Sequence, residues 1–549
     1  MNRPGQPDER AQDPGTSPVR GGRHRRPRAR AGGLAPIPFR QELTPVTFLE
    51  RAGVVHAGRV AVIDGDVSYT WAQFRSRSRR LASALRKASI RAGERVGWLA
   101  FNSEPLLLAH YGVPQAGAAI VAINTRFSAS EIAYVIEHSS CRLIFHSPGL
   151  ASQLEQVPDT IPRIALGSQF EEFLALGSDD EVASWLRHED DLIAIDYTSG
   201  TTGRPKGVMY HHRGAFLNAI GMVVEDRLDS QSTYLWTLPM FHCNGWSHTW
   251  AMAAAGVTSV CVPRIDPPLI WQLLEEHRIT HLNAAPTVLI MLANDAAAHR
   301  LEHPVRVCAG GAPPSPTLIA QMESFNIELV HLYGLTETYG PLTINVPPSH
   351  PLAPAEQAQY KARQGFAHLL AGEVKVVDEH MDELPNDGLS MGEVVARGNT
   401  LMTGYFREPQ ATSRAFRGGW LHTGDVGVTH PDGSIELRDR IKDMVVSGGE
   451  NISTIELEQA VMSHPAVMEA AVIAIPDPKW GEVPKAFVVL RPGCSASADD
   501  IVAHVRTRLA GFKVPKVIEF AELPKTSTGK IQKYVLRERE RERHPPPDE

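Results

Sequence analysis

From Gln41 onward, short apolar runs alternate along the chain with segments of helical periodicity. The runs with the length and composition of strands are residues 96–102, 142–147, 191–200, 258–263 and 281–286. Helical spacing of apolar residues marks residues 75–88 and 267–279. Because strands that alternate with helices usually pair as parallel neighbours, the pattern predicts an α/β fold. We expect a large N-terminal domain of stacked, mostly parallel sheets covered by helices.

A second rhythm begins near Glu373, where strand-like segments are joined by turn residues instead of helices. The segments are residues 372–379, 392–398 and 433–440, and the turn residues are Asp387, Gly388, Asp432 and Gly433. This pattern predicts a small β-barrel subdomain over about residues 372–439, at the end of a large domain that spans residues 39–439.

The C-terminal part of the chain mixes strand-like and helical segments, at residues 453–464, 467–477, 485–492 and 498–511. They predict a small α+β domain over residues 440–535. Residues 1–38 are rich in Pro, Gly and Arg and lack apolar periodicity, so we expect a disordered extension, whose presence in the native protein the sequence leaves open. Residues 536–549 are expected to form a solvated charged tail.

Composition excludes several classes of protein. A formal net charge of -7 over 549 residues argues against a protein that works by neutralising nucleic-acid phosphates. The longest apolar stretch, residues 250–263, is shorter than the ~20 residues of a spanning helix, so it predicts buried core and no integral membrane association. The cysteines stand singly, which favours a reduced, cytoplasmic setting without disulfides or a zinc site; they are Cys141, Cys243, Cys261, Cys308 and Cys494.

Directly after the apolar run LIAIDY comes the Gly-rich segment TSGTTGRPKGV, residues 198–208. Its glycines permit close backbone approach, and its hydroxyls and lysine donate to anionic oxygens, so the segment predicts a phosphate-binding loop. It is not a Walker A loop, because Lys206 is followed by Gly207. The candidate nucleotide-binding residues of this loop are Thr198, Ser199, Gly200, Thr201, Thr202, Gly203 and Lys206.

This segment resembles the signature of the acyl-adenylate-forming superfamily, which contains acyl-CoA synthetases, the adenylation domains of peptide synthetases and beetle luciferases. Further motifs follow in the family's order over about residues 41–535. In LPMFHCNGW, the resemblance places His242 beside the carboxylate site. In CAGGAPPS, residues Gly310, Gly311, Ala312 and Pro313 offer backbone without bulk for a flat purine, and the resemblance places adenine and part of the acid pocket there.

Two more motifs carry polar groups suited to a nucleotide. LYGLTETYG contains Tyr333, Gly334, Thr336 and Glu337. A carboxylate beside a triphosphate is repulsive without a bridging cation, so Glu337 is the candidate Mg²⁺ ligand, with Thr336 as an α-phosphate donor and Tyr333 as a stacking partner of adenine. A carboxylate and a guanidinium together hold two ribose hydroxyls, the role we assign to Asp425 of WLHTGD and Arg440 of RDRIKD.

The resemblance also assigns roles in the C-terminal domain. Lys442 corresponds to the hinge about which this small domain is mobile. Gly448 and Gly449 resemble the loop that forms the thiol tunnel. Lys530, in LPKTSTGKIQK, corresponds to the lysine of adenylation, whose ammonium neutralises charge that gathers in the transition state.

These motifs predict an enzyme that uses ATP and Mg²⁺ to make an acyl-adenylate and then passes the acyl group to coenzyme A. The catalytic candidates are Lys530, His242, Thr336 and Glu337. Three alternatives stay open: a carrier-protein thiol as acceptor, activation of nitrite to diazotise an aminoaryl acid in secondary metabolism, and a non-catalytic adenylate-binding protein. The sequence does not decide between a monomer and a homodimer.

The acid-site neighbourhood looks closest to the branch that activates medium-chain fatty acids, methylthiopropionate-type acids and plant arylacrylic acids. The candidate pocket residues are Trp246, His248, Trp250, Asn283 and Tyr339. His248 stands where that branch often has Tyr or Phe. If its side chain enters the pocket, an amino- or hydroxy-bearing acid is favoured over an alkyl chain; otherwise it faces a packed region, and the sequence leaves both open.

Overall fold

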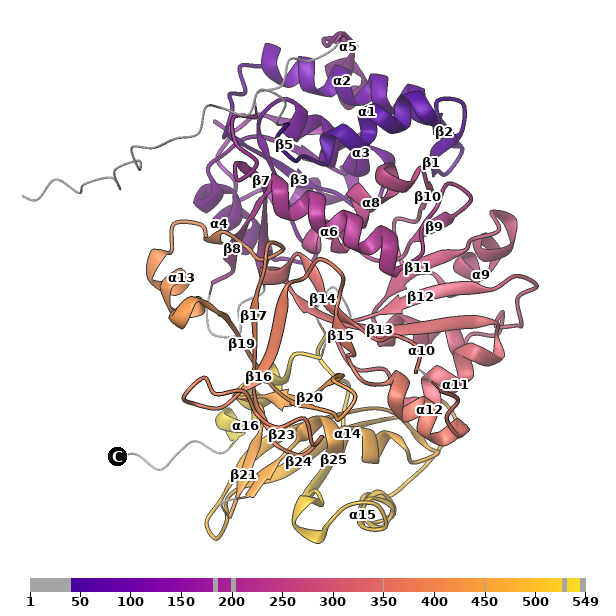
Figure 1. Cartoon of the computed structure of the whole chain (residues 1–549), viewed down its shortest axis with the longest axis vertical. Helices are drawn as coiled ribbons and strands as arrows, with labels where there is room; N and C mark the ends of the chain where they lie inside the picture. Colours follow the sequence, from indigo (N-terminus) through magenta and orange to yellow (C-terminus); the bar gives the residue numbers. More distant parts are fainter. Residues whose placement is uncertain are drawn as a thin grey trace, which may run out of the picture. The chain divides into compact units, whose positions relative to one another are not determined.

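The computed structural model describes residues 41–180, 186–198, 204–348, 350–448, 450–525 and 531–543 (Figure 1). The described residues from Glu42 onward form one compact unit. The extension expected over residues 1–38 lies outside the described residues. Among the described residues, no helix has both the length and the apolar content needed to span a membrane.

A nine-stranded sheet forms one half of the large domain. Its central neighbours from β13 to β1 are all parallel, and antiparallel pairs occur only at its two ends. In spatial order the strands are β15 (Phe366–Ala367), β14 (Gly340–Ile344), β13 (Ile327–Leu335), β12 (Val305–Ala309), β11 (His281–Ala284), β9 (Thr233–Trp236), β10 (Thr258–Cys261), β1 (Val60–Asp64) and β2 (Val67–Thr70).

A seven-stranded sheet forms the other half. It is parallel from β7 to β6, and the strands that follow the Gly-rich segment add antiparallel pairs at one edge. In spatial order the strands are β18 (Gly404–Tyr405), β8 (Lys206–His211), β7 (Leu192–Thr198), β4 (Ala119–Ala122), β3 (Arg95–Leu99), β5 (Cys141–His146) and β6 (Arg163–Ala165). The expected α/β architecture with mostly parallel sheets is confirmed.

The helices of the large domain cover these sheets and begin at sequence signals. Thr70 and Ser128 cap α2 and α4 in reciprocal capping boxes with Gln73 and Glu131, which satisfy free N–H groups of the first turn. The helices are α1 (Val46–Val55), α2 (Trp71–Lys87), α3 (Glu104–Gln115), α4 (Ala129–Ser139), α5 (Ser168–Ala175), α6 (His212–Glu225), α8 (His248–Ala255), α9 (Pro267–Glu276), α10 (Pro286–Ala293), α11 (Pro316–Ser324), α12 (Pro354–Lys361) and α13 (Pro409–Ala415). The short segment α7 (Cys243–Trp246) between α6 and α8 has positive φ and is not a right-handed helix.

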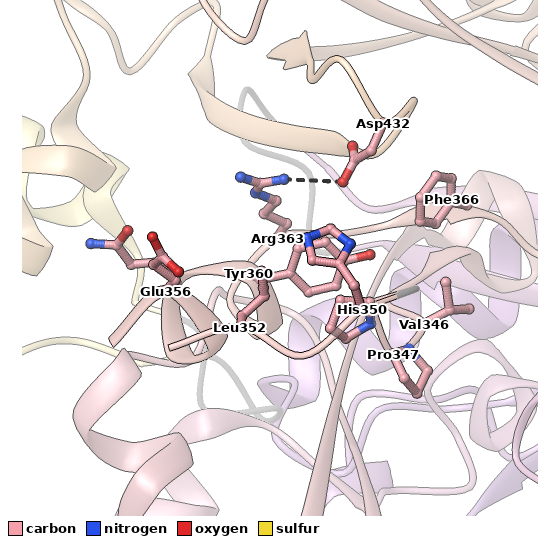
Figure 2. A pocket seen from close by; sticks show the side chains of 11 residues that line it. Val346, Pro347, His350, Leu352, Glu356, Tyr360, Arg363, Phe366 and Asp432 are labelled. Carbon is pink, nitrogen blue, oxygen red and sulfur yellow. Dashed lines mark hydrogen bonds and ion pairs between the residues drawn. The ribbon is translucent and has the colours of Figure 1, made fainter. Parts of the chain in front are cut away.

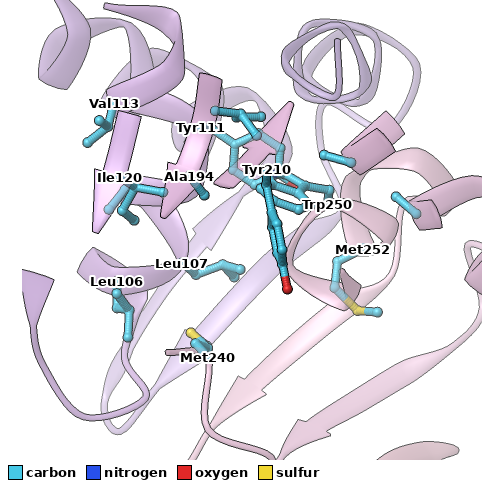
Figure 3. Packing of buried hydrophobic residues seen from close by; sticks show 14 of the residues in the cluster. Leu106, Leu107, Tyr111, Val113, Ile120, Ala194, Tyr210, Met240, Trp250 and Met252 are labelled. Atoms are coloured by element: carbon cyan, nitrogen blue, oxygen red, sulfur yellow. The ribbon is translucent and has the colours of Figure 1, made fainter. Parts of the chain in front are cut away.

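The largest hydrophobic cluster joins both sheets through helices α3 and α8. Ile120 on β4 and Ala194 on β7 belong to it, as do Tyr234 on β9 and Trp250 on α8. Figure 3 shows part of this cluster, with Tyr111, Tyr210 and Trp250 among its members. Burial on this scale fixes the two sheets relative to each other, so loops at their strand ends are held in a defined arrangement.

The barrel-like segment is a four-stranded antiparallel sheet. Its strands, in spatial order, are β16 (Glu373–Val377), β17 (Gly392–Arg397), β19 (Leu421–Thr429) and β20 (Ile435–Arg440). The pairing of β19 with β20 sets Asp425 opposite Arg440.

Among the described residues, the small C-terminal α+β module has a five-stranded sheet and three α-helices. The strands are β21 (Val445–Ser447), β22 (Glu450–Ile452), β23 (Val467–Asp477), β24 (Gly481–Leu490) and β25 (Val517–Phe520), and the helices are α14 (Thr454–Met462), α15 (Ala498–Arg506) and α16 (Lys533–Arg543).

Helix α16 corrects the expectation of a solvated tail from residue 536. Leu536 and Glu540 lie one helical turn apart and are both buried. Leu536 joins the module's core, and the Glu540 carboxylate accepts from the buried Lys485 ammonium at 2.8 Å. The many charged residues of this segment suggested a solvated tail, but Leu536 and Glu540 share one buried face of the helix.

Candidate functional site

The Gly-rich segment joins two antiparallel strands of the seven-stranded sheet. Thr198 ends β7 and lies opposite Lys206, the first residue of β8. The five residues between the described parts, Ser199, Gly200, Thr201, Thr202 and Gly203, lie outside the described residues. The described flanks place Lys206 at the same sheet edge as the short strand β18, which pairs with β8.

Lys206, Tyr405 and Glu337 meet beside this segment, although they come from three distant parts of the chain. The Lys206 ammonium lies 5.0 Å from the centre of the Tyr405 ring, a cation–π distance. The Tyr405 hydroxyl donates to Glu337 Oε1 at 2.7 Å. Burial and the nearby Glu337 carboxylate raise the pKa of Tyr405, so its phenol remains a donor that orients the carboxylate. Tyr405 was not among the residues predicted from the sequence.

Tyr333, Asp425 and Arg440 form a second cluster. The Tyr333 hydroxyl donates to Asp425 Oδ2 at 2.7 Å, and Arg440 Nε lies 3.1 Å from Asp425 Oδ1. Burial and the Asp425 carboxylate raise the pKa of Tyr333 well above its ordinary value. The predicted carboxylate–guanidinium pair is therefore present, and the predicted stacking residue is bound to it through its hydroxyl.

Strand β13 and the turn after it connect the two clusters. Tyr333 lies within β13, and Thr336 and Glu337 lie in the 3₁₀ turn Thr336–Thr338 that follows. The Thr336 carbonyl accepts from the Tyr210 hydroxyl at 2.6 Å, and Thr336 Oγ1 lies 3.6 Å from Cys243 Sγ. Gly334 has a packing reason of its own, because an added Cβ would lie 1.7 Å from the Gly340 carbonyl oxygen.

The segment after His242 has an unusual backbone. His242 is half-buried and precedes α7, and residues 243–247 all have positive φ, from 48° to 63°. We call residues 243–247 the left-handed turn. Left-handed geometry costs about 1–2 kcal/mol per residue that is neither Gly nor Asn, so Cys243, Trp246 and Ser247 together cost roughly 3–6 kcal/mol. Such strain persists only where the surroundings impose it.

Hydrogen bonds to strand β7 and helix α6 hold the left-handed turn. Asn244 Nδ2 donates to Asp196 Oδ2 on β7 at 2.5 Å. Asn218 Nδ2 on α6 donates to Ser247 Oγ at 2.9 Å and to the Tyr339 carbonyl at 3.1 Å. Asp196 was not among the residues predicted from the sequence, although a carboxylate inside the apolar run LIAIDY is a visible signal.

Trp246 is the turn residue that lies against the motif glycines. A Cβ on Gly310 would lie 3.0 Å from Trp246 Cη2, and one on Gly340 would lie 3.1 Å from Trp246 Cβ. Both glycines therefore leave the space that the indole occupies. Gly311, next to Gly310, has a φ of 86° and nothing within 4 Å of an added Cβ, so the backbone from Gly311 to Pro313 borders open space at its start.

The other candidate pocket residues are fully buried. Trp250 donates through Nε1 to the His110 carbonyl at 3.0 Å and lies in the core (Figure 3). Tyr339 stacks on Tyr210 with ring centres 3.9 Å apart, and its hydroxyl accepts from the His211 N–H at 2.6 Å.

His248 and Asn283 lie in a buried polar cluster behind Trp246. His248 Nδ1 lies 3.0 Å from the Trp246 carbonyl oxygen, Nε2 lies 3.3 Å from Asp226 Oδ2, and Asn283 Nδ2 lies 3.1 Å from Nε2. Arg306 Nε donates to Asp226 Oδ1 at 3.2 Å. His248 thus occupies a packed, hydrogen-bonded position. Within the described part of the chain, Asn283 Oδ1 has no hydrogen-bond partner.

The C-terminal candidates are only partly described. Lys442 lies between β20 and β21, where partial burial and the cations Arg440 and Arg537 lower its pKa to about 8. The Gly448 N–H donates to the Trp480 carbonyl at 2.8 Å. Gly449 and Lys530 lie outside the described residues.

The residues present fit a magnesium ion held jointly with nucleotide phosphates. Among the described residues, no group of three or more His, Cys, Asp or Glu side chains could hold a metal ion alone. Mg²⁺ on ATP needs only one or two protein carboxylates because phosphates and water complete its octahedron. Glu337, oriented by Tyr405 beside Lys206, is a suitable single carboxylate.

One cavity among the described residues lies elsewhere. It has a volume of about 510 Å³ and is lined by Tyr360, Arg363, Phe366 and Asp432 among others, with Arg363 paired to Asp432 at 3.4 Å (Figure 2). It contains none of the candidate site residues.

Two family models match the chain. The model for AMP-binding enzymes matches residues 49–406, and the model for the AMP-binding enzyme C-terminal domain matches residues 456–530. The first range contains the candidate residues from Thr198 to Tyr339. The second range contains Lys530.

Characterised proteins match over nearly the whole chain. The acetate–CoA ligase CCL3 of Humulus lupulus is 40% identical over 541 residues, which cover 91% of this chain and 95% of the relative. The peroxisomal trans-cinnamate:CoA ligase of Petunia hybrida is 39% identical over 533 residues, which cover 90% of this chain and 94% of the relative. The structure of ATP-bound MatB from Rhodopseudomonas palustris superposes with a TM-score of 0.81 at 26% identity, covering 90% of this chain and 98% of MatB. The chain therefore belongs to the AMP-binding acyl-CoA ligase superfamily.

Proposed function

We propose that the chain joins a carboxylic acid to ATP as an acyl-adenylate, releases pyrophosphate, and then transfers the acyl group to the thiol of coenzyme A. One observation carries the assignment of the nucleotide site. Four motifs supply the residues that meet in two clusters, and strand β13 with its following turn connects these clusters; the residues are Lys206, Tyr333, Glu337, Asp425 and Arg440.

In this proposal the Tyr333 cluster holds the nucleoside. Asp425 accepts from one ribose hydroxyl and Arg440 donates to the other. The Tyr333 ring is the surface against which adenine stacks, opposite the backbone of residues 310–313. The hydrogen bond from Tyr333 to Asp425 and the register of Asp425 with Arg440 support this arrangement, because they pre-organise all three groups.

The Lys206 cluster holds the phosphates together with Thr198, Ser199, Gly200, Thr201, Thr202 and Gly203. Mg²⁺, when bound at Glu337, supplies positive charge that neutralises phosphate oxygens. Thr336 donates its hydroxyl hydrogen to an α-phosphate oxygen. The 3.6 Å contact from Cys243 Sγ supports this role, since a thiol that donates to Thr336 Oγ1 leaves the hydroxyl's own hydrogen available.

The reaction has two steps. A carboxylate oxygen attacks the α-phosphorus, the bond from that phosphorus to the bridging oxygen breaks, and pyrophosphate leaves. The thiolate of coenzyme A then attacks the acyl carbon, the carbon–oxygen bond to AMP breaks, and AMP leaves. Lys530 stabilises the charge of the first step, and His242 borders the carboxylate.

We further propose that residues 440–535 form the domain that moves between these steps, with its hinge at Lys442. Adenylation needs Lys530 in the site, whereas thiolysis needs a channel for pantetheine, which Gly448 and Gly449 would border. The division of the strands between sheets supports this boundary, because the last strand of the four-stranded sheet ends at Arg440 and the first strand of the five-stranded sheet begins at Val445.

For the acid, we propose a short- to medium-chain or aryl carboxylic acid without a polar substituent. Trp246 packs with Leu238, Cys308 and Leu332 around Gly310, which favours an apolar pocket wall. Both ring nitrogens of His248 already have partners in the protein, so they offer no unpaired group to a substrate.

The test is pyrophosphate release from ATP with acetate, butyrate, cinnamate and 3-aminocinnamate, each with and without coenzyme A. We expect release that depends on the acid, and an acyl-CoA product. A rate that no acid raises would refute the function. If product forms only with a phosphopantetheine-bearing carrier protein, the acceptor is that carrier's thiol and not coenzyme A. If product forms only with nitrite and an aminoaryl acid, the chain activates nitrite and the acceptor is the arylamine. Preference for aminocinnamate over cinnamate would instead assign the unpartnered Asn283 Oδ1 to substrate recognition.

A further inference from the structure

The left-handed turn faces a second left-handed segment. Tyr339 and Gly340, which follow the 3₁₀ turn with Thr336 and Glu337, have φ of 62° and 95°. Asn218 donates both to Ser247 of the turn and to the Tyr339 carbonyl, and Trp246 packs on Gly340. The left-handed turn of the acid-site motif therefore packs against Tyr339 and Gly340, the left-handed residues of the motif that contains Thr336 and Glu337.

Asp196 anchors this arrangement to the sheet. It lies on β7 two residues before Thr198, is 2% exposed, and accepts from Asn244 Nδ2 through Oδ2. In the described part of the chain its other oxygen, Oδ1, has no partner. A buried carboxyl group with one partner is costly, so its retention in an apolar strand calls for a role.

We propose that Asp196 is a positioning residue for the acid site: acting through Asn244, it holds the left-handed turn so that Trp246 stays against Gly310 and His242 keeps its place at the start of the turn. The inference rests on the proposed function, because it assigns the acid to this end of the site. Asp196 touches neither reactant. Its effect passes through one hydrogen bond into five consecutive residues whose backbone would otherwise relax.

Three variants separate positioning from general stability. Asn244→Gly removes the clamp while suiting the φ of 48°, so it adds no backbone strain. Asp196→Ala removes the acceptor. Asp196→Asn keeps an acceptor oxygen of the same shape, and because burial raises the pKa of Asp196 to about 8, it also resembles the protonated side chain present at neutral pH.

The matched control is Asn326→Gly. Asn326 also has a left-handed backbone, with φ of 68°, and its Nδ2 donates to the Leu301 carbonyl at 3.2 Å. It follows α11, outside the candidate site. The control therefore loses one hydrogen bond from an Asn of the same backbone conformation.

The assay is acid-dependent ATP–pyrophosphate exchange, with KM measured separately for acid and for ATP. Asn244→Gly and Asp196→Ala should raise KM for the acid roughly tenfold or more, with KM for ATP changed less than about twofold. Asp196→Asn and Asn326→Gly should keep the acid KM of the wild type. If Asp196→Ala does not fold, Asn244→Gly still decides. An unchanged acid KM in Asn244→Gly, or equal rises in both KM values, would overturn the inference. Exchange that is absent in the wild type itself would instead refute the proposed function.

Discussion

The buried carboxyl group of Asp196 makes a specific prediction about stability and pH. Burial raises its pKa from 3.8 to about 8, while hydrogen bonding by Asn244 opposes the shift only in part. Between pH 3.8 and about pH 8, Asp196 is protonated in the folded chain and ionised in the unfolded chain. Stability must therefore fall as pH rises across this window, by up to about 1.4 kcal/mol per pH unit.

Asp196→Asn removes this titration while keeping the side chain's shape. From pH 5 to pH 7, the free energy of unfolding of the wild type should fall by roughly 3 kcal/mol relative to that of the variant, because the slope is about 1.4 kcal/mol per pH unit. The difference should level off above about pH 8, where both states are ionised. All other groups titrate alike in the two proteins, so the comparison isolates Asp196.

The measurement is the urea midpoint of the large-domain transition for both proteins at pH 5, 6, 7 and 8, followed by tryptophan fluorescence. We expect the variant's advantage to grow steadily with pH. A wild-type minus variant difference that is constant over this range would show that Asp196 is ionised in the folded protein, and the account of the Asp196–Asn244 contact as one between a neutral acid and an amide would be wrong.

Three further outcomes follow from the contacts of the site. Tyr405→Phe removes the hydrogen bond donated to the Glu337 carboxylate. Because a hydrogen bond to a charged group is lost, KM for MgATP in pyrophosphate exchange should rise about tenfold. An unchanged KM would contradict the orienting role of Tyr405. Gly334→Ala places a Cβ 1.7 Å from the Gly340 carbonyl oxygen, so the thermal midpoint should fall by several degrees, and a midpoint within one degree of wild type would contradict that close approach. Lys530→Ala should lose adenylation by roughly 10²–10³-fold but spare thiolysis of supplied acyl-adenylate, and equal losses in both half-reactions would contradict its assignment.

The apolar rhythm of the sequence was enough to predict the layered fold. Strands β3, β5, β7, β10 and β11 coincide with the predicted runs, because continuous apolar segments of this length can be satisfied only between covered faces of a sheet. Helix α16 was missed because its charged residues dominate the composition. The partner that makes Glu540 a buried residue, Lys485, lies 55 positions earlier in the chain.

The candidate site was predictable where chemistry alone selects the residue. The pairing of Asp425 with Arg440 followed from what a ribose requires. The role of Tyr405 did not, since a lone tyrosine in MTGYF carries no local signal and reaches Glu337 over 68 positions. The left-handed turn was also hidden, because Cys243, Trp246 and Ser247 have no preference for that conformation, and only the Asn-Gly pair inside it is typical of a turn.

The charged end of the chain has a practical consequence for anyone who shortens this protein. Lys485 is 6% exposed and has two counter-charges, Glu519 on β25 and Glu540 on α16. Expression from a gene that stops at residue 535 would delete Glu540 and Leu536 together. It would leave an ammonium group inside the small module with half of its anionic partners, and it would open the core beside β23. Trimming what reads as a dispensable hydrophilic appendage would thus damage the module that carries the segment with Lys530.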